Sequence, residues 1–253
     1  GAGIARQAYL EIMKKMIGRY ASHGICVSRK AAEALFGDAW ESDGRWRLLF
    51  CGIDLSPFGE NVGGERVRRE LGIPEKAYVI GHVGNFREQK NHVYLMDIAA
   101  SLVESGADCY WFLLIGDGPL RPRIKRRAEE LGLADKVIFA GARSDVPKLM
   151  LGAMDLFLFP SLYEGLGVAL LEAQAAGLPC VISDVIAEEI DVIKENMHRL
   201  SLGEPPAVWA DAIQAIRKSR KVCSQKECVE MMKNSRFNIA TCVSQIEELY
   251  SGG

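Results

Sequence analysis

The sequence predicts an α/β protein built on a doubly wound parallel sheet of about six strands. From Tyr78 onward, short apolar runs of strand length alternate with longer segments of helical periodicity, a pattern that places parallel strands side by side and helices on both faces. The chain has 253 residues, of which 49% are hydrophobic. That is enough to bury a core of this kind.

The expected strands are short and apolar, and glycine or proline follows several of the helices that connect them. The strands are residues 78–83, 111–115, 137–139, 156–159, 180–183 and 198–202, the last with the weakest pattern. The expected helices are residues 91–105, 120–131, 146–152, 168–176 and 187–195. Residues 206–250 have the pattern of two or three further helices, the final one spanning 236–250.

The first 50 residues have a different pattern. Residues 4–20 predict an amphipathic helix, 24–28 a short strand, 29–36 a helix and 46–50 another strand. Turn-forming residues with little periodicity then predict an interdomain linker over 51–60. The expected organisation is an N-terminal segment (1–50), this linker, a ligand-binding sheet domain (61–235) and a C-terminal helix (236–253).

Charge and cysteine usage narrow the functional class. Lysine and arginine total 31 against 33 acidic residues, so nothing favours nucleic acid as the main partner. The seven cysteines include no CxxC pair and no metal-ligand spacing, which indicates reduced thiols, a cytoplasmic location and no metal site. No apolar run is long enough to cross a bilayer, which leaves peripheral contact with the inner face of a membrane open.

The segment from Glu164 to Glu172 is the most informative part of the chain. It lies between a predicted strand and a predicted helix, where Gly165 and Gly167 let backbone N–H groups approach a phosphate. The helix N-terminus adds partial positive charge. Carboxylates accept hydrogen bonds from hydroxyl groups, so two of them around this turn suit a ligand with hydroxyls on either side of a diphosphate.

Three more loops follow strands and therefore lie at the same carboxyl edge, where open parallel sheets bind ligands. They carry Gly84, Asn85, Arg87 and Lys90 after the first strand, Gly116, Asp117 and Gly118 after the second, and Arg143 after the third. Arg87 and Lys90 supply cations for a diphosphate. Asp117 either contacts the ligand or caps the next helix. Gly116-x-Gly118 is a weak dinucleotide fingerprint, because Arg121 stands where its third glycine would fall.

Several motifs in the same order resemble those of retaining family 4 glycosyltransferases of the GT-B fold. They are residues 81–86, 90–92, 114–120, 139–141 and 160–165. The form Ser-Leu-Tyr-Glu-Gly-Leu at 161–166 is most similar to bacterial enzymes of capsular and exopolysaccharide synthesis. The resemblance implies that the chain is the Rossmann-like C-terminal half of such an enzyme.

The resemblance also implies roles for single residues. Glu164 would hold hydroxyls of the donor sugar, the backbone of Gly165, Leu166 and Gly167 would face sugar and diphosphate, and Glu172 would bind the ribose. Lys90 matches the diphosphate-binding lysine, and Arg143 lies in the loop that frames the base. The family usually has arginine at the position of Asn85, so either Arg87 replaces that charge, which we favour, or the site is weaker. Glu164, Lys90 and Arg87 are the expected catalytic groups.

The implied activity is transfer of a sugar, with retention and without a required metal or cofactor, from a nucleotide-sugar donor to a glycan or lipid-linked acceptor. A UDP-sugar is favoured over a GDP- or ADP-sugar. Because only about 50 residues precede the linker, where the family has a whole acceptor-binding domain, we expect donor binding with little or no transfer by this chain alone. The alternatives are a non-catalytic module that binds a sugar nucleotide or a protein, and a related GT-B epimerase.

Overall fold

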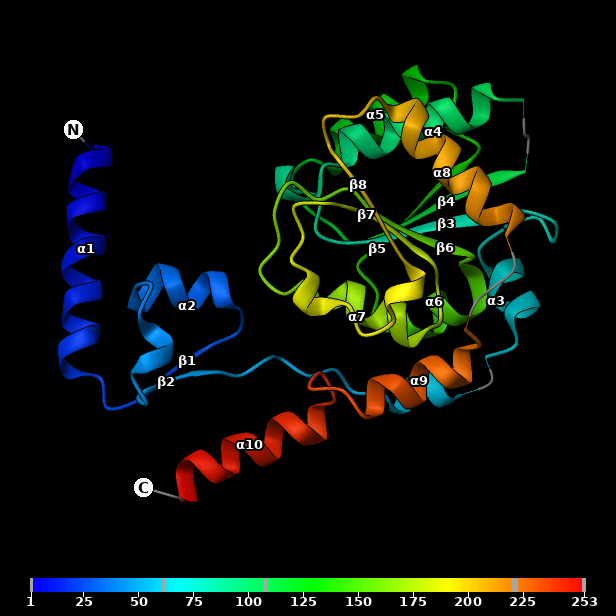
Figure 1. Cartoon of the computed structure of the whole chain (residues 1–253). Coiled ribbons are helices and arrows are strands. Elements are labelled where there is room, and N and C mark those ends of the chain that lie inside the picture. Colours follow the sequence, from blue (N-terminus) through cyan, green and yellow to red (C-terminus); the bar gives the residue numbers. More distant parts are fainter. Residues whose placement is uncertain (1, 61, 107–108, 220–222, 252–253) are drawn as a thin grey trace. The chain divides into compact units, whose positions relative to one another are not determined.

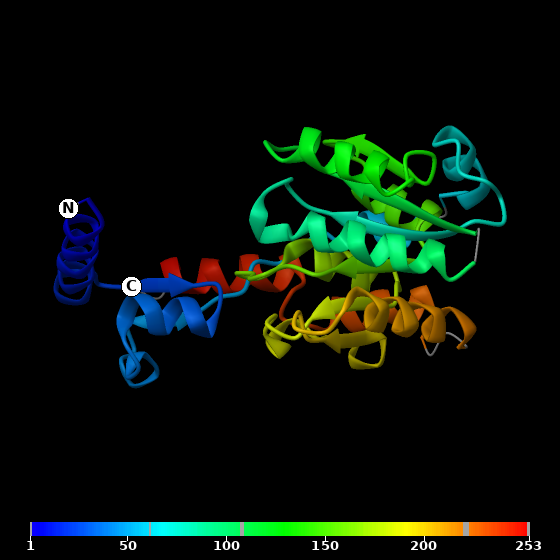
Figure 2. The ribbon, with the colours of Figure 1, turned by 90° about the horizontal axis from the view of Figure 1, so that it is seen from above.

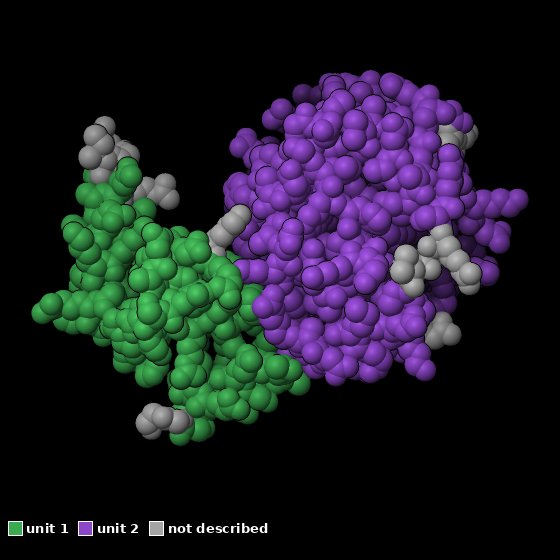
Figure 3. All heavy atoms as spheres, viewed as in Figure 1, with its two compact units in different colours: residues 1–52, 239–253 green, residues 53–238 purple. Residues whose placement is uncertain are grey.

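The computed structural model describes residues 2–60, 62–106, 109–219 and 223–251. The chain divides into two compact units (Figure 3). Residues 1–52 and 239–253 form unit 1, and residues 53–238 form unit 2.

Unit 1 is small and mainly helical. Its elements are α1 (Ala2–Tyr20), β1 (Gly24–Cys26), α2 (Arg29–Phe36), the 3-10 turn η1 (Trp40–Ser42), β2 (Trp46–Leu48) and α10 (Ile239–Ser251). The strands β1 and β2 pair in parallel. Phe36 stacks on Trp46, with ring centroids 4.2 Å apart, and both belong to a small apolar cluster. The predicted elements of the first 50 residues are confirmed to within a few residues.

Unit 2 contains a six-stranded parallel sheet, which confirms the predicted fold class. Its strands are β3 (Tyr78–Val83), β4 (Tyr110–Ile115), β5 (Val137–Gly141), β6 (Leu156–Phe159), β7 (Cys180–Ser183) and β8 (Met197–Leu200). They lie in the order β5-β4-β3-β6-β7-β8. The chain builds outward from β3 to β5, returns to place β6 on the other side of β3, and then builds in the opposite direction. The boundary between β3 and β6 is therefore the topological switch point of the sheet.

Helices cover both faces of this sheet. They are α3 (Gly64–Glu70), α4 (His92–Glu104), α5 (Arg121–Glu130), α6 (Val146–Ala153), α7 (Val168–Ala175), α8 (Pro206–Lys218) and α9 (Gln225–Lys233), together with the 3-10 turns η2 (Ser56–Gly59), η3 (Glu88–Lys90), η4 (Glu188–Ile190) and η5 (Lys194–Asn196). The helices α4, α5 and α8 lie side by side over one face (Figure 2). The opposite face is covered by α6 and α7 (Figure 1).

The strands are apolar throughout because both faces of the sheet are covered. All four residues of β6 are buried, as expected for a strand between two helix layers. Ile80, Phe112 and Leu158 contribute to the large core beneath α4, α5 and α8. On the other face, Gly81 leaves room for the side chain of Met154, whose sulfur lies 2.0 Å from the position that a Cβ on residue 81 would take.

The predicted helix over residues 187–195 is wrong. This segment forms η4 and η5, with three residues of irregular backbone between them. The buried side chain of Gln174 explains the difference, because its Oε1 accepts from the backbone N–H groups of Val192 (2.9 Å) and Ile193 (3.0 Å). These bonds replace the hydrogen bonds that a continuous helix would make. Ile190 and Ile193 are buried, so helical spacing of apolar residues here reflects burial in a loop.

The last part of unit 2 and the final helix match the expectation of two or three helices, as α8, α9 and α10. Residues 236–238 are not helical, because the backbone N–H of Ile53 donates to the carbonyl of Phe237 (2.8 Å) and Ile53 bridges to Asn238. The helix α3 is additional to the predicted elements. No helix in the described part of the chain combines the length and apolar character needed to cross a membrane.

Candidate functional site

The candidate site lies at the carboxyl edge of the sheet, on both sides of the switch point. The loop after β3 carries Gly84 to Lys90, and the loop after β6 carries Glu164 to Gly167. Because β3 and β6 are hydrogen-bonded neighbours, these two loops emerge next to each other. The loops after β4 and β5 lie farther along the same edge.

Lys90 and Glu164 form an ion pair across the switch point. The Lys90 Nζ donates to Glu164 Oε1 at 2.7 Å, and the side chains are 15% and 6% exposed. The ammonium also lies 4.4 Å from the centroid of the Phe159 ring, at the end of β6. The structure therefore brings together the lysine predicted to bind the diphosphate and the glutamate predicted to hold the sugar. Because both side chains are largely shielded from solvent, each charge would be destabilising without its partner.

Gln89 is a contact residue that the sequence analysis missed. Its Nε2 donates to the carbonyl of Tyr163 at 3.0 Å and approaches Glu164 Oε2 at 3.4 Å. The backbone carbonyl of Gln89 accepts from the backbone N–H of Leu162 at 2.8 Å. A neutral glutamine next to a conspicuous lysine carries no sequence signal of its own. Only the pairing of β3 with β6 shows that it reaches the glutamate loop.

The turn before α7 offers several backbone donors at one place. Gly167 has a φ of 69° and occupies the position before the first helical residue, a conformation that glycine adopts without strain. Within the described residues, the backbone N–H groups of Gly165, Leu166 and Gly167 donate to no protein acceptor. A Cβ on residue 165 would meet nothing within 4 Å. The turn thus combines backbone donors that no protein group uses with free space beside Gly165.

Glu172 lies on α7 just beyond this turn and is half-buried. Burial raises the pKa of its carboxyl group. Within the described part of the chain it has no hydrogen-bond or ion-pair partner that would offset this burial. A half-buried carboxylate without a protein partner is typical of a ligand-binding position.

Gly116 and Gly118 have a packing role that the sequence did not reveal. A Cβ on residue 116 would lie 2.1 Å from the carbonyl oxygen of Gly84, and one on residue 118 would lie 2.7 Å from that of Phe86. The two loops are joined by a hydrogen bond from the Phe86 N–H to the Asp117 carbonyl (3.0 Å). These glycines therefore allow the loops after β3 and β4 to approach closely. Their proposed contact with a donor stays a prediction.

Asp117 does not cap the following helix. Its Oδ1 accepts from the backbone N–H of Gly118 at 2.8 Å, and α5 begins after Leu120 without a side-chain cap. The capping alternative is therefore wrong, because the carboxylate stabilises its own loop. Its contact with a ligand stays a prediction.

The two arginines of the site differ in their surroundings. Arg143 makes a two-point ion pair with Asp145, at 2.8 and 2.7 Å, and this hydrogen bonding lowers the pKa of the aspartate. Arg87 is exposed, as is Asn85, and has no ion pair within the described residues. Arg87 is therefore the cation that can move to a ligand without breaking a contact.

Two histidines beside Lys90 belong to the core. His82 Nδ1 is 2.9 Å from the carbonyl oxygen of Leu158, and the His82 and His92 rings meet edge to face at 4.7 Å. Burial lowers the pKa of both, that of His92 to about 4. No group of histidine, cysteine and carboxylate side chains with the geometry of a metal site occurs among the described residues.

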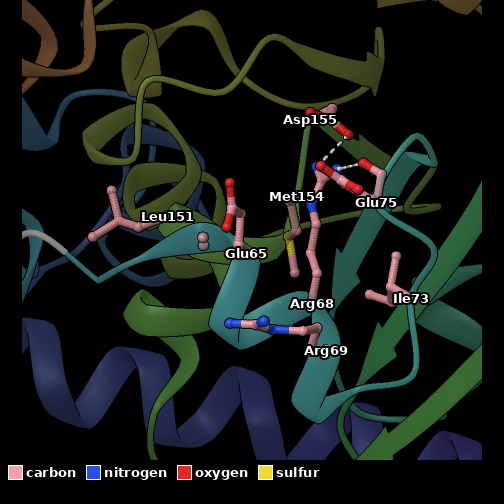
Figure 4. A pocket seen from close by; sticks show the side chains of 10 residues that line it. Glu65, Arg68, Arg69, Ile73, Glu75, Leu151, Met154 and Asp155 are labelled. Carbon is pink, nitrogen blue, oxygen red and sulfur yellow. Dashed lines mark hydrogen bonds and ion pairs between the residues drawn. The ribbon is translucent and has the colours of Figure 1, made fainter.

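A hollow of about 590 Å³ lies at the opposite edge of the sheet (Figure 4). Arg68 crosses it and donates to Asp155 at 2.7 Å and to the Ala77 carbonyl at 3.0 Å. Asp155 directly precedes β6, so this hollow is at the amino ends of the strands. Two of its charged side chains, Arg68 and Asp155, are engaged with each other as an ion pair, whereas the carboxyl edge presents open backbone donors. The carboxyl edge is therefore the better ligand site.

A parallel sheet with a switch point, an open glycine turn and paired charges at the carboxyl edge defines a doubly wound α/β protein whose candidate ligand site lies at that edge. The family model described as glycosyl transferases group 1 matches residues 64–236. The chain belongs to this family of glycosyltransferases.

Known relatives agree with this assignment. The chain is 41% identical over 205 residues to EpsF of Bacillus subtilis (strain 168), covering 81% of this chain and 53% of EpsF. It is 27% identical over 231 residues to the Escherichia coli UDP-Gal:alpha-D-GlcNAc-diphosphoundecaprenol alpha-1,3-galactosyltransferase, covering 89% of this chain and 59% of that enzyme. The chain thus spans between half and three fifths of these relatives.

Solved structures support the fold. The crystal structure of Anabaena Alr3699/HepE in complex with UDP and glucose aligns with a TM-score of 0.82 at 22% identity, covering 98% of this chain and 67% of that one. WaaG, a glycosyltransferase involved in lipopolysaccharide biosynthesis, aligns with a TM-score of 0.76 at 22% identity, covering 90% and 62%. These neighbours are GT-B glycosyltransferases, which confirms the fold expected from the motifs.

Proposed function

We propose that unit 2 binds a nucleotide-sugar donor, with a UDP-sugar favoured, for a glycosyltransferase that transfers the sugar with retention. The single observation that carries this proposal is the convergence of Lys90, Glu164, the open turn before α7 and the unpartnered Glu172 at one switch point. Support also comes from the solved neighbours that hold UDP, UDP and glucose, or UDP-glucose.

Each group suits one part of such a donor. The N–H groups before α7 and the helix N-terminus suit the diphosphate, and Lys90 and Arg87 add positive charge. Glu172 is placed beyond the turn, where it would accept hydrogen bonds from ribose hydroxyls, and Glu164 would accept from sugar hydroxyls. During transfer, negative charge grows on the leaving diphosphate. Cations and backbone donors fixed around it lower the barrier by stabilising that charge.

The proposal extends to the biological role of the whole protein. The relative that acts on a diphosphoundecaprenol-linked sugar supports a glycan or lipid-linked acceptor in polysaccharide synthesis, at the cytoplasmic side of a membrane. Nothing in the proposed roles requires a metal or another cofactor, since protein groups supply the charge stabilisation. In this proposal the present chain provides the donor half of the site.

Calorimetric titration tests donor binding. The purified chain is titrated with UDP-, GDP- and ADP-sugars, and we expect the UDP-sugars to bind most tightly. Glu172→Gln should weaken UDP binding by about tenfold or more, because a hydrogen bond to a charged group contributes about 1.5–3 kcal/mol. Glu104→Gln, at the far end of α4, is the matched control. Absence of binding by every nucleotide sugar would refute the proposal and favour a non-catalytic interaction module.

A further inference from the structure

Both oxygens of the Glu164 carboxylate receive a donor from one short turn. Lys90 donates to Oε1 at 2.7 Å, and Gln89 approaches Oε2 at 3.4 Å. The two donors are consecutive residues of η3, 74 residues or more from the glutamate in sequence. The orientation of this nearly buried carboxylate is therefore set from the β3 loop.

The two donors differ in how firmly they are held. Gln89 is tied to the glutamate loop by two further bonds: its side-chain Nε2 donates to the Tyr163 carbonyl (3.0 Å), and its backbone carbonyl accepts from the Leu162 N–H (2.8 Å). Lys90 ends in a compact charge on a flexible stem. A diphosphate beside the glycine turn would attract the charged Lys90 ammonium more strongly than the neutral Gln89 amide, whose Nε2 already donates to Tyr163 and Glu164.

We infer that Gln89 is a positioning residue that keeps Glu164 aimed at the donor sugar when Lys90 turns to the diphosphate. This inference rests on the proposed function. As the ammonium moves, Oε1 loses its protein donor and becomes free to accept a sugar hydroxyl, while the Gln89 amide still holds Oε2. Gln89 thereby keeps Glu164 in position for the sugar while Lys90 binds the nucleotide diphosphate.

The test compares UDP with UDP-sugars on the 253-residue chain. Gln89→Met keeps the length and removes the amide, and Gln89→Glu also places a like charge beside Glu164. We expect Gln89→Met to weaken binding of UDP-glucose or UDP-galactose by about five- to tenfold, the loss of one hydrogen bond to a charged group, and Gln89→Glu to weaken it more. Gln89→Met, which changes no charge, should bind UDP within about twofold of the parent. Glu88→Gln, in the same turn but without contact to residues 162–164 within the described structure, is the control.

The results distinguish failure of the positioning role of Gln89 from failure of the proposed donor binding. If UDP itself does not bind the parent chain, the proposed function fails. If UDP binds but neither sugar adds affinity, Glu164 does not read the sugar and the inference fails while nucleotide binding stands. Equal losses for UDP and the UDP-sugars in Gln89→Met would show a general structural role and overturn the inference. Thermal melting of each variant detects that structural effect directly.

Discussion

The Lys90–Glu164 pair should contribute measurably to the stability of unit 2. Lys90→Met keeps most of the aliphatic stem but leaves the Glu164 carboxylate, with 6% of its side chain exposed, without its cation. Removing one partner of a buried pair costs about 3–5 kcal/mol. We expect about 3 kcal/mol here, because Lys90 is partly exposed and Gln89 still donates to the carboxylate.

Urea unfolding followed by tryptophan fluorescence measures this loss, and the buried Trp209 reports on unit 2. The double variant Lys90→Met, Glu164→Gln should recover about 1–2 kcal/mol relative to the single variant, because it leaves no unpaired charge. Lys125→Met, on the exposed side of α5, is the control and should change stability by less than about 0.5 kcal/mol. A loss below that limit for Lys90→Met, or strictly additive effects, would refute the claim that the two side chains depend on each other.

The glycines and a histidine give two further predictions. Gly116→Ala should destabilise the chain by about 2 kcal/mol or more, since its Cβ would lie 2.1 Å from a backbone oxygen at a φ of 135°. In contrast, Gly165→Ala, whose Cβ meets nothing within 4 Å, should unfold at the same urea concentration as the parent. Between pH 6.5 and about 4 the unfolded His92 binds a proton that the folded ring does not, so stability falls as pH decreases through this window, by at most about 3 kcal/mol from this residue. His92→Phe should make the pH dependence of unfolding shallower there, and an unchanged slope would show that His92 does not titrate as the structure implies.

Local sequence was sufficient to predict most of unit 2. The four apolar residues of β6 follow one another in the chain, and the glycines before α7 lie within three residues of that helix. Both patterns can therefore be recognised from short stretches of sequence. Gly167 adopts the positive φ that such a turn needs. The candidate ligand edge was predicted from one further rule, that open parallel sheets bind at their carboxyl ends.

The contacts within the site could not be predicted in the same way, because they join loops that are far apart in sequence. Nothing near Gln89 indicates Tyr163 as its partner, and the Lys90–Glu164 pair requires β6 to lie beside β3. The residues around 190 show the reverse problem. Their apolar spacing favours a helix, yet the distant Gln174 amide holds their N–H groups. Gly116 shows a third difficulty of prediction. In the sequence, a glycine needed for loop packing looks the same as one that approaches a phosphate.

The arrangement of cations bears on which residue takes the place of the arginine that the family usually has at Asn85. Lys90 is neutralised by Glu164, and Arg143 is held at two points by Asp145. A diphosphate carries more negative charge than one shared lysine can balance, so a second cation is needed near the open turn. Arg87 is exposed, has no ion pair in the described part of the chain, and begins the same short turn that supplies Gln89 and Lys90. It can reach a ligand without losing a protein contact, whereas Arg143 would first have to leave its aspartate. We therefore propose Arg87 as the second phosphate cation, in place of the arginine that the family usually has at Asn85.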